Sequence, residues 1–232
     1  MKIGFDVISD LNLLPGEEFN WEGKATSLYL IIAGNISNDV RTIRQTLGHL
    51  SKFYQGIFYI LGSFEYDATN DIPKRTEEIF KICRTLKNIA LLHQHVVVID
   101  GIAIVGANCW YGNTYHTDPI TDVQVEHHRN EDILYLRNTI GKLQKHLDVK
   151  KIIVVTNSVP GIGLYFGEHN CLINDQLPPN LSLSTDIEKK VSHWIYGTYM
   201  KEVDAQINGI NYINNGYFKK KQYWSKRIEV EI

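Results

Sequence analysis

The chain has 232 residues, of which 44% are hydrophobic and 22% are charged, and its formal net charge is −2. These values are typical of a globular protein with a full hydrophobic core, and they predict one α/β domain over residues 1–232. The near-neutral charge excludes a global attraction to nucleic acid or to anionic membranes. The apolar runs fall short of the roughly 18 residues that a membrane span needs, which excludes an integral membrane protein.

The cysteines indicate the compartment. Cys83, Cys109 and Cys171 are odd in number and far apart in the sequence. A disulfide framework normally has an even number of cysteines, so this pattern favours the reducing cytosol and a cytoplasmic protein. The abundance of Ile, Asn, Lys and Tyr is typical of AT-rich genomes and favours a phage or a low-GC bacterium as the source.

Three apolar segments near the N-terminus predict strands, and each leads directly into a polar turn. In open α/β sheets, ligands usually bind at the carboxyl ends of the strands, so the side chains of these turns are expected to form one site. The strands and their turns are Met1–Ser9 with Asp10 and Asn12, Leu28–Ala33 with Gly34 and Asn35, and Ile57–Leu61 with Gly62, Ser63, Phe64 and Glu65.

Two helices are predicted in the same part of the chain. The first runs from Asp39 to about Tyr54, with Ser37 or Asn38 as its N-cap, because apolar residues recur there at steps of three and four. The second runs from about Pro73 to Lys87 and has its proline in the first turn, where no backbone N–H is needed.

A hairpin and a third helix follow. The strands His95–Ile99 and Ile102–Val105 flank an Asp-Gly pair, which is a strong signal for a tight turn. The helix is the clearest of the chain, because Asn130 is a good N-cap, acidic residues follow it, and an apolar stripe continues to Leu147.

Two long connections lie in the second half of the chain, at Tyr111–Arg129 and Val159–Thr185. Connections of this length are unusual in a compact domain and are typical of recognition loops. Between them, the buried strand Lys151–Val155 ends in Thr156-Asn157-Ser158. Trp194–Tyr196 leads into Gly197 and Thr198, and later strands are predicted at Asp204–Ile207, Ile210–Asn214 and Ile228–Ile232.

The order and spacing of these turns resemble those of the calcineurin-like metallophosphoesterases. That family carries D-x-H, G-D, G-N-H-[DE], a later His and G-H-x-H in succession. The segments that match are Asp10-Leu-Asn12, Gly34-Asn35, Gly62-Ser63-Phe64-Glu65, Thr156-Asn157 and Gly197-Thr198-Tyr199-Met200, with Gly106-Ala-Asn-Cys-Trp110 and Asn215-Gly216-Tyr217 at two further family motifs. The resemblance implies an α/β fold, a four-layered α/β/β/α sandwich of two mixed β-sheets flanked by helices.

The metal chemistry of that family is mostly missing from this sequence. Family members hold two metal ions that bind the phosphate and lower the pKa of a bridging water. Of the ligands that the resemblance implies, only Asp10 is kept, and the other positions hold the neutral residues Asn12, Asn35, Ser63, Asn157, Thr198 and Met200. Phe64 stands at the position of the histidine that assists catalysis, and a phenyl ring cannot protonate a leaving group. Glu65, which follows it, is expected to support the site.

One carboxylate with neutral amides cannot offset the four positive charges of two divalent ions. We therefore expect no resident metal, and only a weak single Mg²⁺, Mn²⁺ or Ca²⁺ at Asp10 stays open. The replacements predict a site repaired without metal, because Asn, Ser and Thr side chains can hydrogen-bond to one another. Acids left in the same positions without metal would repel.

This pattern predicts a catalytically degenerate scaffold or binding module with a protein partner, a role that inactive members of the superfamily also have. Aromatic residues and a histidine in the long connections are the candidate recognition residues: Trp110, Tyr111, Tyr115, His116, Tyr165 and Phe166. Two alternatives stay open. One is a phosphoesterase that works with a single metal or with other ligands such as His116, His127 or His128, and the other is metal-free binding of a phosphate or nucleotide.

Each of three further patterns has a structural explanation as well as a functional one. His93 and His95 can share a strand face and bind zinc, but scattered surface histidines are commoner. Gly161–Gly167 resembles a dinucleotide-binding loop, but no helix follows it, which favours a plain loop. Lys219–Arg227 mixes basic and aromatic residues and is either a nucleic-acid contact or a strand edge protected by lysines.

Overall fold

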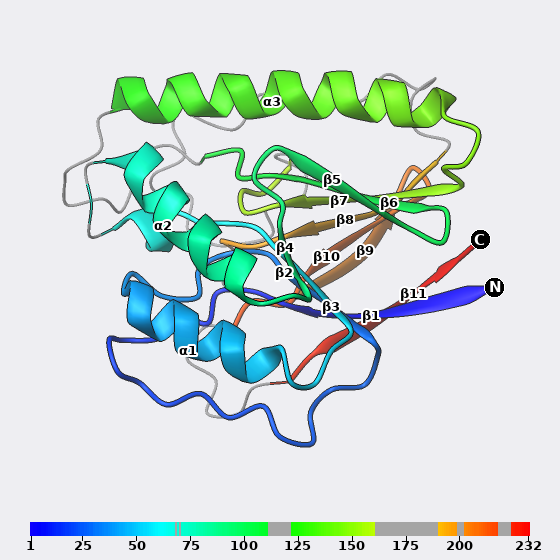
Figure 1. Ribbon diagram of the computed structural model, residues 1–232. Coiled ribbons are helices and arrows are strands. Elements are labelled where there is room, and N and C mark those ends of the chain that lie inside the picture. The colour runs from blue at the N-terminus through cyan, green and yellow to red at the C-terminus, as the bar shows by residue number, and fades with distance from the viewer. Residues whose placement is uncertain (68, 70, 111–121, 161–189, 199–201, 218–223) are drawn as a thin grey trace.

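The computed structural model describes residues 1–67, 69, 71–110, 122–160, 190–198, 202–217 and 224–232, and its strands form two mixed sheets (Figure 1). The five-stranded sheet has the order β11-β1-β2-β3-β4. Its strands are β1 (Lys2–Ile8), β2 (Tyr29–Ile32), β3 (Gly56–Tyr59), β4 (Ile89–Leu91) and β11 (Lys226–Glu231). The six-stranded sheet has the order β5-β6-β7-β8-β10-β9. Its strands are β5 (His95–Ile99), β6 (Ile102–Ala107), β7 (Lys151–Thr156), β8 (Val191–Tyr196), β9 (Val203–Ile207) and β10 (Ile210–Asn214).

The helices of the described residues are α1 (Val40–Leu50), α2 (Ile72–Thr85) and α3 (Asp122–Lys145), with a short 3-10 helix η1 (Phe64–Tyr66). Aspartates begin two of them: the side chain of Asp39 accepts from Thr42 N, and that of Asp71 accepts from Lys74 N. A carboxylate at this position satisfies a free backbone N–H and suits the positive end of the helix dipole.

The alternation of side chains along the strands separates three layers of core. In β2, Leu30 packs with α1 and α2, whereas its neighbour Ile31 faces the second sheet. In β7, Ile153 faces the five-stranded sheet, and Val154 packs with α3. The layers are therefore α1 with α2, the five-stranded sheet, the six-stranded sheet, and α3, as Figure 1 shows. The predicted four-layered α/β/β/α sandwich is confirmed.

Parallel pairing brings the turns of the site to one end of the sandwich. β1, β2 and β3 run parallel in one sheet, and β6, β7 and β8 run parallel in the other. The turns after β1 and β2 are joined by backbone hydrogen bonds from Asp10 N to Gly34 O at 3.0 Å and from Asn12 N to Asn35 O at 2.9 Å. Polar residues from distant parts of the chain therefore meet where these strands end.

The third helix differs from its prediction. α3 begins at Asp122, so Asn130 lies inside the helix instead of capping it. Residues 123–129 contain few apolar side chains, of which Val125 is buried. Because their apolar periodicity is weak, the first two turns of α3 were not predicted as helix. At the other end, Leu147 lies beyond the helix and is 83% exposed, so it is not part of the apolar stripe.

The first helix is shorter than predicted. α1 ends at Leu50, before Tyr54, and Asp39 is its cap instead of Ser37 or Asn38. After the helix the chain turns, and the side-chain amide of Asn88 donates to two of its carbonyls, on Ser51 and Tyr54, at 2.9 and 2.7 Å. The three-residue strand β4 was not predicted because so short a segment shows no periodicity. None of the described helices combines the length and the apolar character that crossing a membrane requires.

Candidate functional site

Side chains from four strand ends meet around Asp10, which follows β1 and is fully buried. Asn35 Nδ2 donates to Asp10 Oδ1 at 2.7 Å, and Ser9 Oγ donates to Oδ2 at 2.7 Å. The backbone N–H of Thr198 donates to both carboxylate oxygens, at 2.9 and 3.1 Å. We call Ser9, Asp10, Asn35, Asn157 and Thr198 the strand-end network.

Asn157 connects this network across the two sheets. Its Oδ1 accepts from Thr198 Oγ1 at 2.7 Å and from Ser63 N at 3.2 Å. Its Nδ2 donates to the carbonyl of Ala33, at the end of β2, at 2.9 Å. The Asn35 side chain likewise both donates and accepts, because its Oδ1 accepts from Phe64 N at 2.9 Å. The amide groups thus have partners for their donors and for their acceptors.

The backbone of the site is mostly in the left-handed region. The φ angles are 54° at Asp10, 46° at Asn12, 60° at Asn35 and 56° at Thr198. Asp and Asn adopt this conformation readily, but a β-branched residue such as Thr198 is strained there, by about 1–3 kcal/mol. Gly34, at φ +87°, has no room for a side chain, because a Cβ would lie 2.6 Å from Asn157 Nδ2. The turns are therefore shaped to bring polar groups into close contact.

Burial and hydrogen bonding act in opposite directions on Asp10. The pKa of its carboxyl is raised from 3.8 to about 6, because desolvation by burial outweighs the hydrogen bonds from Asn35, Ser9 and Thr198, which lower it. Asp10 is therefore ionised at neutral pH. The carboxylate is compensated by N–H and O–H dipoles, because no described cation forms an ion pair with it.

Glu65 accepts hydrogen bonds from the turns after β2 and β3. Its Oε2 accepts from Asn35 N at 3.0 Å and from Gly62 N at 2.8 Å. Its Oε1 accepts from Ile36 N at 2.6 Å and from Tyr59 Oη at 2.7 Å. Burial raises the pKa of Glu65, and the hydrogen bonds from Tyr59, Ile36 and Gly62 oppose that shift. The carboxylate therefore fixes the turns after β2 and β3 relative to each other.

Two residues of this arrangement were not anticipated from the sequence. Ser9 lies inside the first predicted strand, where a small polar residue gives no signal of its own. Tyr59 lies in β3 and is fully buried, and a buried tyrosine usually finds a partner for its hydroxyl. That rule, with Glu65 only six positions away, is the signal that could have identified the pair.

Comparison with known proteins places the fold. No family model matches the chain, and no curated protein matches its sequence. Among solved structures, the phosphopantetheinyl hydrolase of Mycobacterium tuberculosis is similar over 98% of this chain and 96% of its own, with a TM-score of 0.66 and 14% identity. The fold is phosphoesterase-like.

Two further structures have similar folds. A candidate 5'-nucleotidase of Staphylococcus aureus, solved with alpha-ketoglutarate, matches 92% of this chain and 48% of its own, with a TM-score of 0.53 and 12% identity. GAP50, the anchor in the inner membrane complex of Plasmodium, matches 97% of this chain and 75% of its own, with a TM-score of 0.52 and 11% identity. At these identities the likeness shows the fold alone.

The side chains of the strand-end network do not fit a pair of metal ions. Asp10 brings the one negative charge of the strand-end network, and both of its oxygens accept from protein donors. The oxygens of Asn35 and Asn157 likewise accept from N–H or O–H groups. A pair of divalent ions needs several anionic or imidazole ligands with free lone pairs, because neutral oxygens alone do not offset its charge. In the described residues, no group of three or more His, Cys, Asp and Glu side chains could hold a metal ion.

The other described residues of the predicted site contact this network without adding a side-chain hydrogen bond to its side chains. Asn12 turns back on its own loop, where its Nδ2 donates to the carbonyl of Asp10 at 3.0 Å. Ser63 and Phe64 contribute backbone N–H groups, as described above, and the Phe64 side chain is half-buried. Met200 lies outside the described residues.

Trp110 was wrongly predicted to be a recognition residue. It is 3% exposed and packs between Tyr66, at 4.7 Å between ring centroids, and His128, at 5.7 Å. It belongs to the core cluster that α1 and α2 also form. The other candidate recognition residues lie outside the described residues: Tyr111, Tyr115, His116, Tyr165 and Phe166.

The histidine pairs do not form the sites that their spacing suggested. His127 and His128 lie in α3 instead of a loop, and both approach Glu131, at 3.4 and 3.3 Å. His93 lies in the turn before β5, and His95 begins the strand, so the two do not share a strand face. The glycine-rich segment 161–167 lies outside the described residues.

The basic-aromatic segment near the C-terminus is described only in part, from residue 224 onward. Lys226 forms an ion pair with Asp204 at 2.6 Å, and Arg227 pairs with Glu229 at 3.1 Å. Both cations therefore have protein partners, which agrees with a protected strand edge. Lys219–Tyr223 lie outside the described residues.

Proposed function

We propose that this chain is a phosphoesterase-fold protein that works without metal, as a scaffold or binding module for a protein partner. The observation that carries the proposal is the environment of Asp10. This is the one acid kept at the positions where the family resemblance implies metal ligands, and its oxygens accept hydrogen bonds from Ser9, Asn35 and Thr198. A carboxylate in this environment has a structural role.

Among the described residues, the strand-end network offers no group suited to phosphoester hydrolysis. A hydrolase of this kind needs a metal-bound water as nucleophile and a group that protonates the leaving oxygen. Asn35 presents an N–H to Asp10 where a bridging acid would stand, and Phe64 has no proton to give. The strand-end network would have to open before any ion could reach the Asp10 oxygens.

The likeness to the Plasmodium protein supports a non-catalytic role, because that protein is named an anchor and shares the fold over nearly all of this chain. The likeness to the phosphopantetheinyl hydrolase favours the rival, a metal-dependent phosphoesterase with a non-standard site. The two proposals differ in what Asp10 does. In the rival proposal Asp10 binds a metal ion. In our proposal Asp10 fixes the turn after β8 by accepting a hydrogen bond from Thr198 N.

Metal binding and hydrolysis separate the two. Protein purified with and without added Mn²⁺ is analysed for bound metals, and hydrolysis of a generic phosphodiester and phosphomonoester is measured with Mn²⁺ present. We expect much less than one equivalent of metal per chain, and hydrolysis at the background rate. Asp10→Asn and Asp148→Asn are compared, since Asp148 is an exposed aspartate far from the site and serves as the matched control.

Two results would overturn the proposal. One is a tightly bound pair of metal ions in the parent protein. The other is an activity that copurifies with the parent and with Asp148→Asn but disappears in Asp10→Asn. The binding role is tested by purifying tagged protein from its source cells with crosslinking. We expect a partner at fixed stoichiometry, and the absence of any such partner would count against the scaffold.

A further inference from the structure

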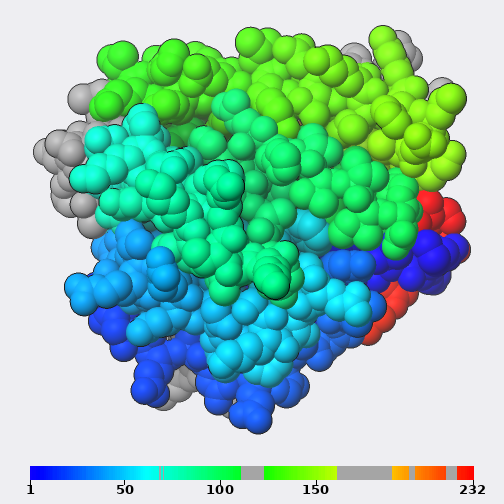
Figure 2. All heavy atoms as spheres, viewed as in Figure 1, coloured from blue at the N-terminus to red at the C-terminus, as the bar shows by residue number. Residues whose placement is uncertain are grey.

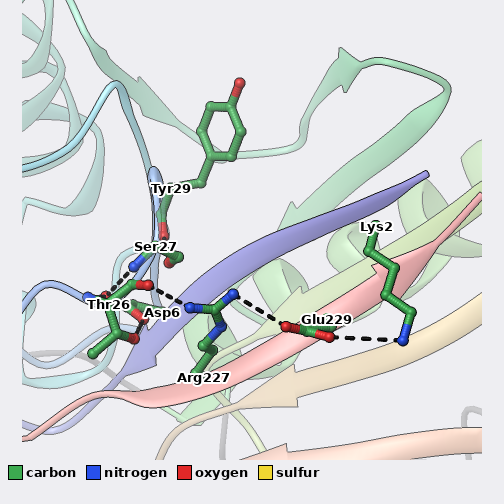
Figure 3. A network of polar contacts seen from close by, with 7 residues as sticks. All are labelled: Lys2, Asp6, Thr26, Ser27, Tyr29, Arg227 and Glu229. Atoms are coloured by element: carbon green, nitrogen blue, oxygen red, sulfur yellow. Dashed lines mark hydrogen bonds and ion pairs between the residues drawn. The ribbon is translucent and has the colours of Figure 1, made fainter.

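The four edge strands of the two sheets are not equally protected. An edge strand exposes unpaired backbone N–H and C=O groups, and natural proteins protect such edges by shortness or by charged side chains. β4 is only three residues long. β11 carries alternating charges, and Figure 3 shows Arg227 and Lys2 on either side of Glu229. β9 is protected by the ion pair from Asp204 to Lys226 of β11.

β5 has no such protection. It reads His-Val-Val-Val-Ile from His95 to Ile99, with no proline and no side chain that is charged at all pH values. Val98 is 51% exposed, and the green atoms of the β5–β6 hairpin lie at the surface in Figure 2. A straight apolar edge of this kind is a template for strand pairing.

The hairpin register shows which backbone groups are free. Ile99 pairs with Ile102 across the two-residue turn, and Val97 pairs with Ile104. In a two-residue hairpin the residues that flank the turn form a hydrogen-bonded pair, and such pairs alternate along the strands. Val97 and Ile99 therefore direct their N–H and C=O groups to β6, whereas Val96 and Val98 direct theirs outward. Outside the ladder, no backbone hydrogen bond joins Val96 or Val98 to another described residue.

We propose that β5 pairs with β5 of a second copy of this chain, antiparallel about a two-fold axis at Val97. In this register Val96 of each copy lies opposite Val98 of the other. Each of these two pairs exchanges two N–H···O bonds, which gives four between the copies. His95 lies opposite Ile99, so no like charges meet.

A second copy suits this edge better than an unrelated strand for two reasons. Val96 and Val98 flank Val97 symmetrically, so this part of the strand complements itself, and the exposed side chain of Val98 is covered by Val96 of the other copy. Pairing also uses the one unprotected edge of each copy among the described strands. The result is a closed two-fold dimer instead of an open filament.

The pairing is a weak one. Two five-residue edges bury well below the roughly 1,200 Å² of a standard interface, so the dimer should form only at high protein concentration. Sedimentation over a wide concentration range should show a reversible shift from monomer to dimer. Val98→Lys should abolish the dimer, because it places a charge on the paired edge, whereas Val98→Thr should keep it. Thermal melting of both variants shows whether each remains folded.

A cysteine crosslink tests the register itself. The two Val97 residues form a non-hydrogen-bonded pair with Cα atoms about 4.5 Å apart, within the range of a disulfide. Val97→Cys should therefore give a disulfide-linked dimer under mild oxidation. Val96→Cys is the matched control, because the two copies of that residue are displaced along the strands and lie too far apart. Both are made with Cys171→Ser, since Cys83 and Cys109 are buried.

The outcomes are distinct. A monomer at all concentrations, or equal crosslinking at positions 96 and 97, would overturn the proposal. So would a dimer that Val98→Lys leaves intact, because it would use another surface. A chain that stays monomeric alone but binds a foreign strand at β5 would show that the edge is an interaction surface for another protein, and self-pairing would be wrong.

Discussion

Replacing Asn35 by aspartate tests how the strand-end network is held together. Asn35 Nδ2 donates to Asp10 Oδ1 at 2.7 Å and lies 3.3 Å from Thr198 Oγ1. Asn35→Asp keeps the shape of the side chain but replaces this N–H donor by an oxygen. Two carboxylates would then face each other in a buried site without a cation between them.

The size of the effect follows from two limits. Two ionised carboxylates about 3.5 Å apart repel by about 5 kcal/mol at an effective dielectric constant of 20. The folded protein can avoid this by binding one proton, which at pH 7 costs about 4 kcal/mol for a group with an ordinary pKa near 4. Binding a proton costs less than the repulsion, so the folded variant should bind one. We therefore expect a loss of about 3–4 kcal/mol in the free energy of unfolding at pH 7.

The sign of the pH dependence is fixed by the same argument. The shared proton means that the folded pKa of the pair is raised above its unfolded value. The destabilisation is therefore largest at high pH and shrinks by about 1.4 kcal/mol per pH unit until about pH 6, where Asp10 of the parent also begins to bind a proton. Parent and variant should therefore still differ by about 2–3 kcal/mol at pH 5.

Urea unfolding in a metal chelator at pH 5 and pH 7 measures both values. Asn20→Asp is the control for the chemical change, because Asn20 is exposed and uses its Oδ1 as an acceptor for Glu22 N at 2.9 Å. That variant should change stability by at most about 0.5 kcal/mol. An Asn35→Asp protein as stable as the parent at pH 7 in chelator would refute the reasoning, since the amide could not then face Asp10.

Three further predictions rest on the same network. Thr198→Val should lose about 1–3 kcal/mol of stability, because it removes the 2.7 Å hydrogen bond to Asn157, whereas Thr198→Ser should lose little; similar losses in urea unfolding would contradict this. The parent should lose up to about 3 kcal/mol relative to Asp10→Asn as the pH rises from 4 to 6, because its folded pKa of about 6 exceeds the unfolded 3.8; parallel pH profiles would exclude that shift. Restoring all the family ligands together should create Mn²⁺ binding detectable by calorimetry, with little turnover and lower stability in chelator. The changes are Asn12→His, Asn35→Asp, Ser63→Asn, Phe64→His, Asn157→His, Thr198→His and Met200→His.

The strand ends could be predicted because their signals are local. The apolar segments that contain β1, β2, β3 and β7 are each followed by polar or glycine residues, and that pattern needs no knowledge of the fold. The order of these motifs then implied the sandwich. What brings Asp10 and Thr198 together is the parallel pairing within each sheet and the packing between them. The sequence contained that information only through its resemblance to a known family.

The errors have a common physical cause, which is that burial is decided by distant partners. Trp110 looked like a loop aromatic, but Tyr66 and His128 enclose it from η1 and α3. The first turns of α3 are polar and depend on packing elsewhere along the helix. Asn12 shares its left-handed backbone with Asn35, yet its amide closes a local turn, and nothing in the sequence separates the two.

The two buried carboxylates of the site show how the metal-free site that we propose would keep its shape. Glu65 accepts from three backbone N–H groups and the Tyr59 hydroxyl, so the turns after β2 and β3 keep their shape whatever the neighbouring side chains bind. Asp10 needs positive potential, and here it comes from the dipoles of Asn35, Ser9 and Thr198. Those dipoles can replace a cation only if every neighbour is a donor. The single reversion Asn35→Asp should therefore destabilise the site, and only a joint reversion with metal present can restore its balance of charge.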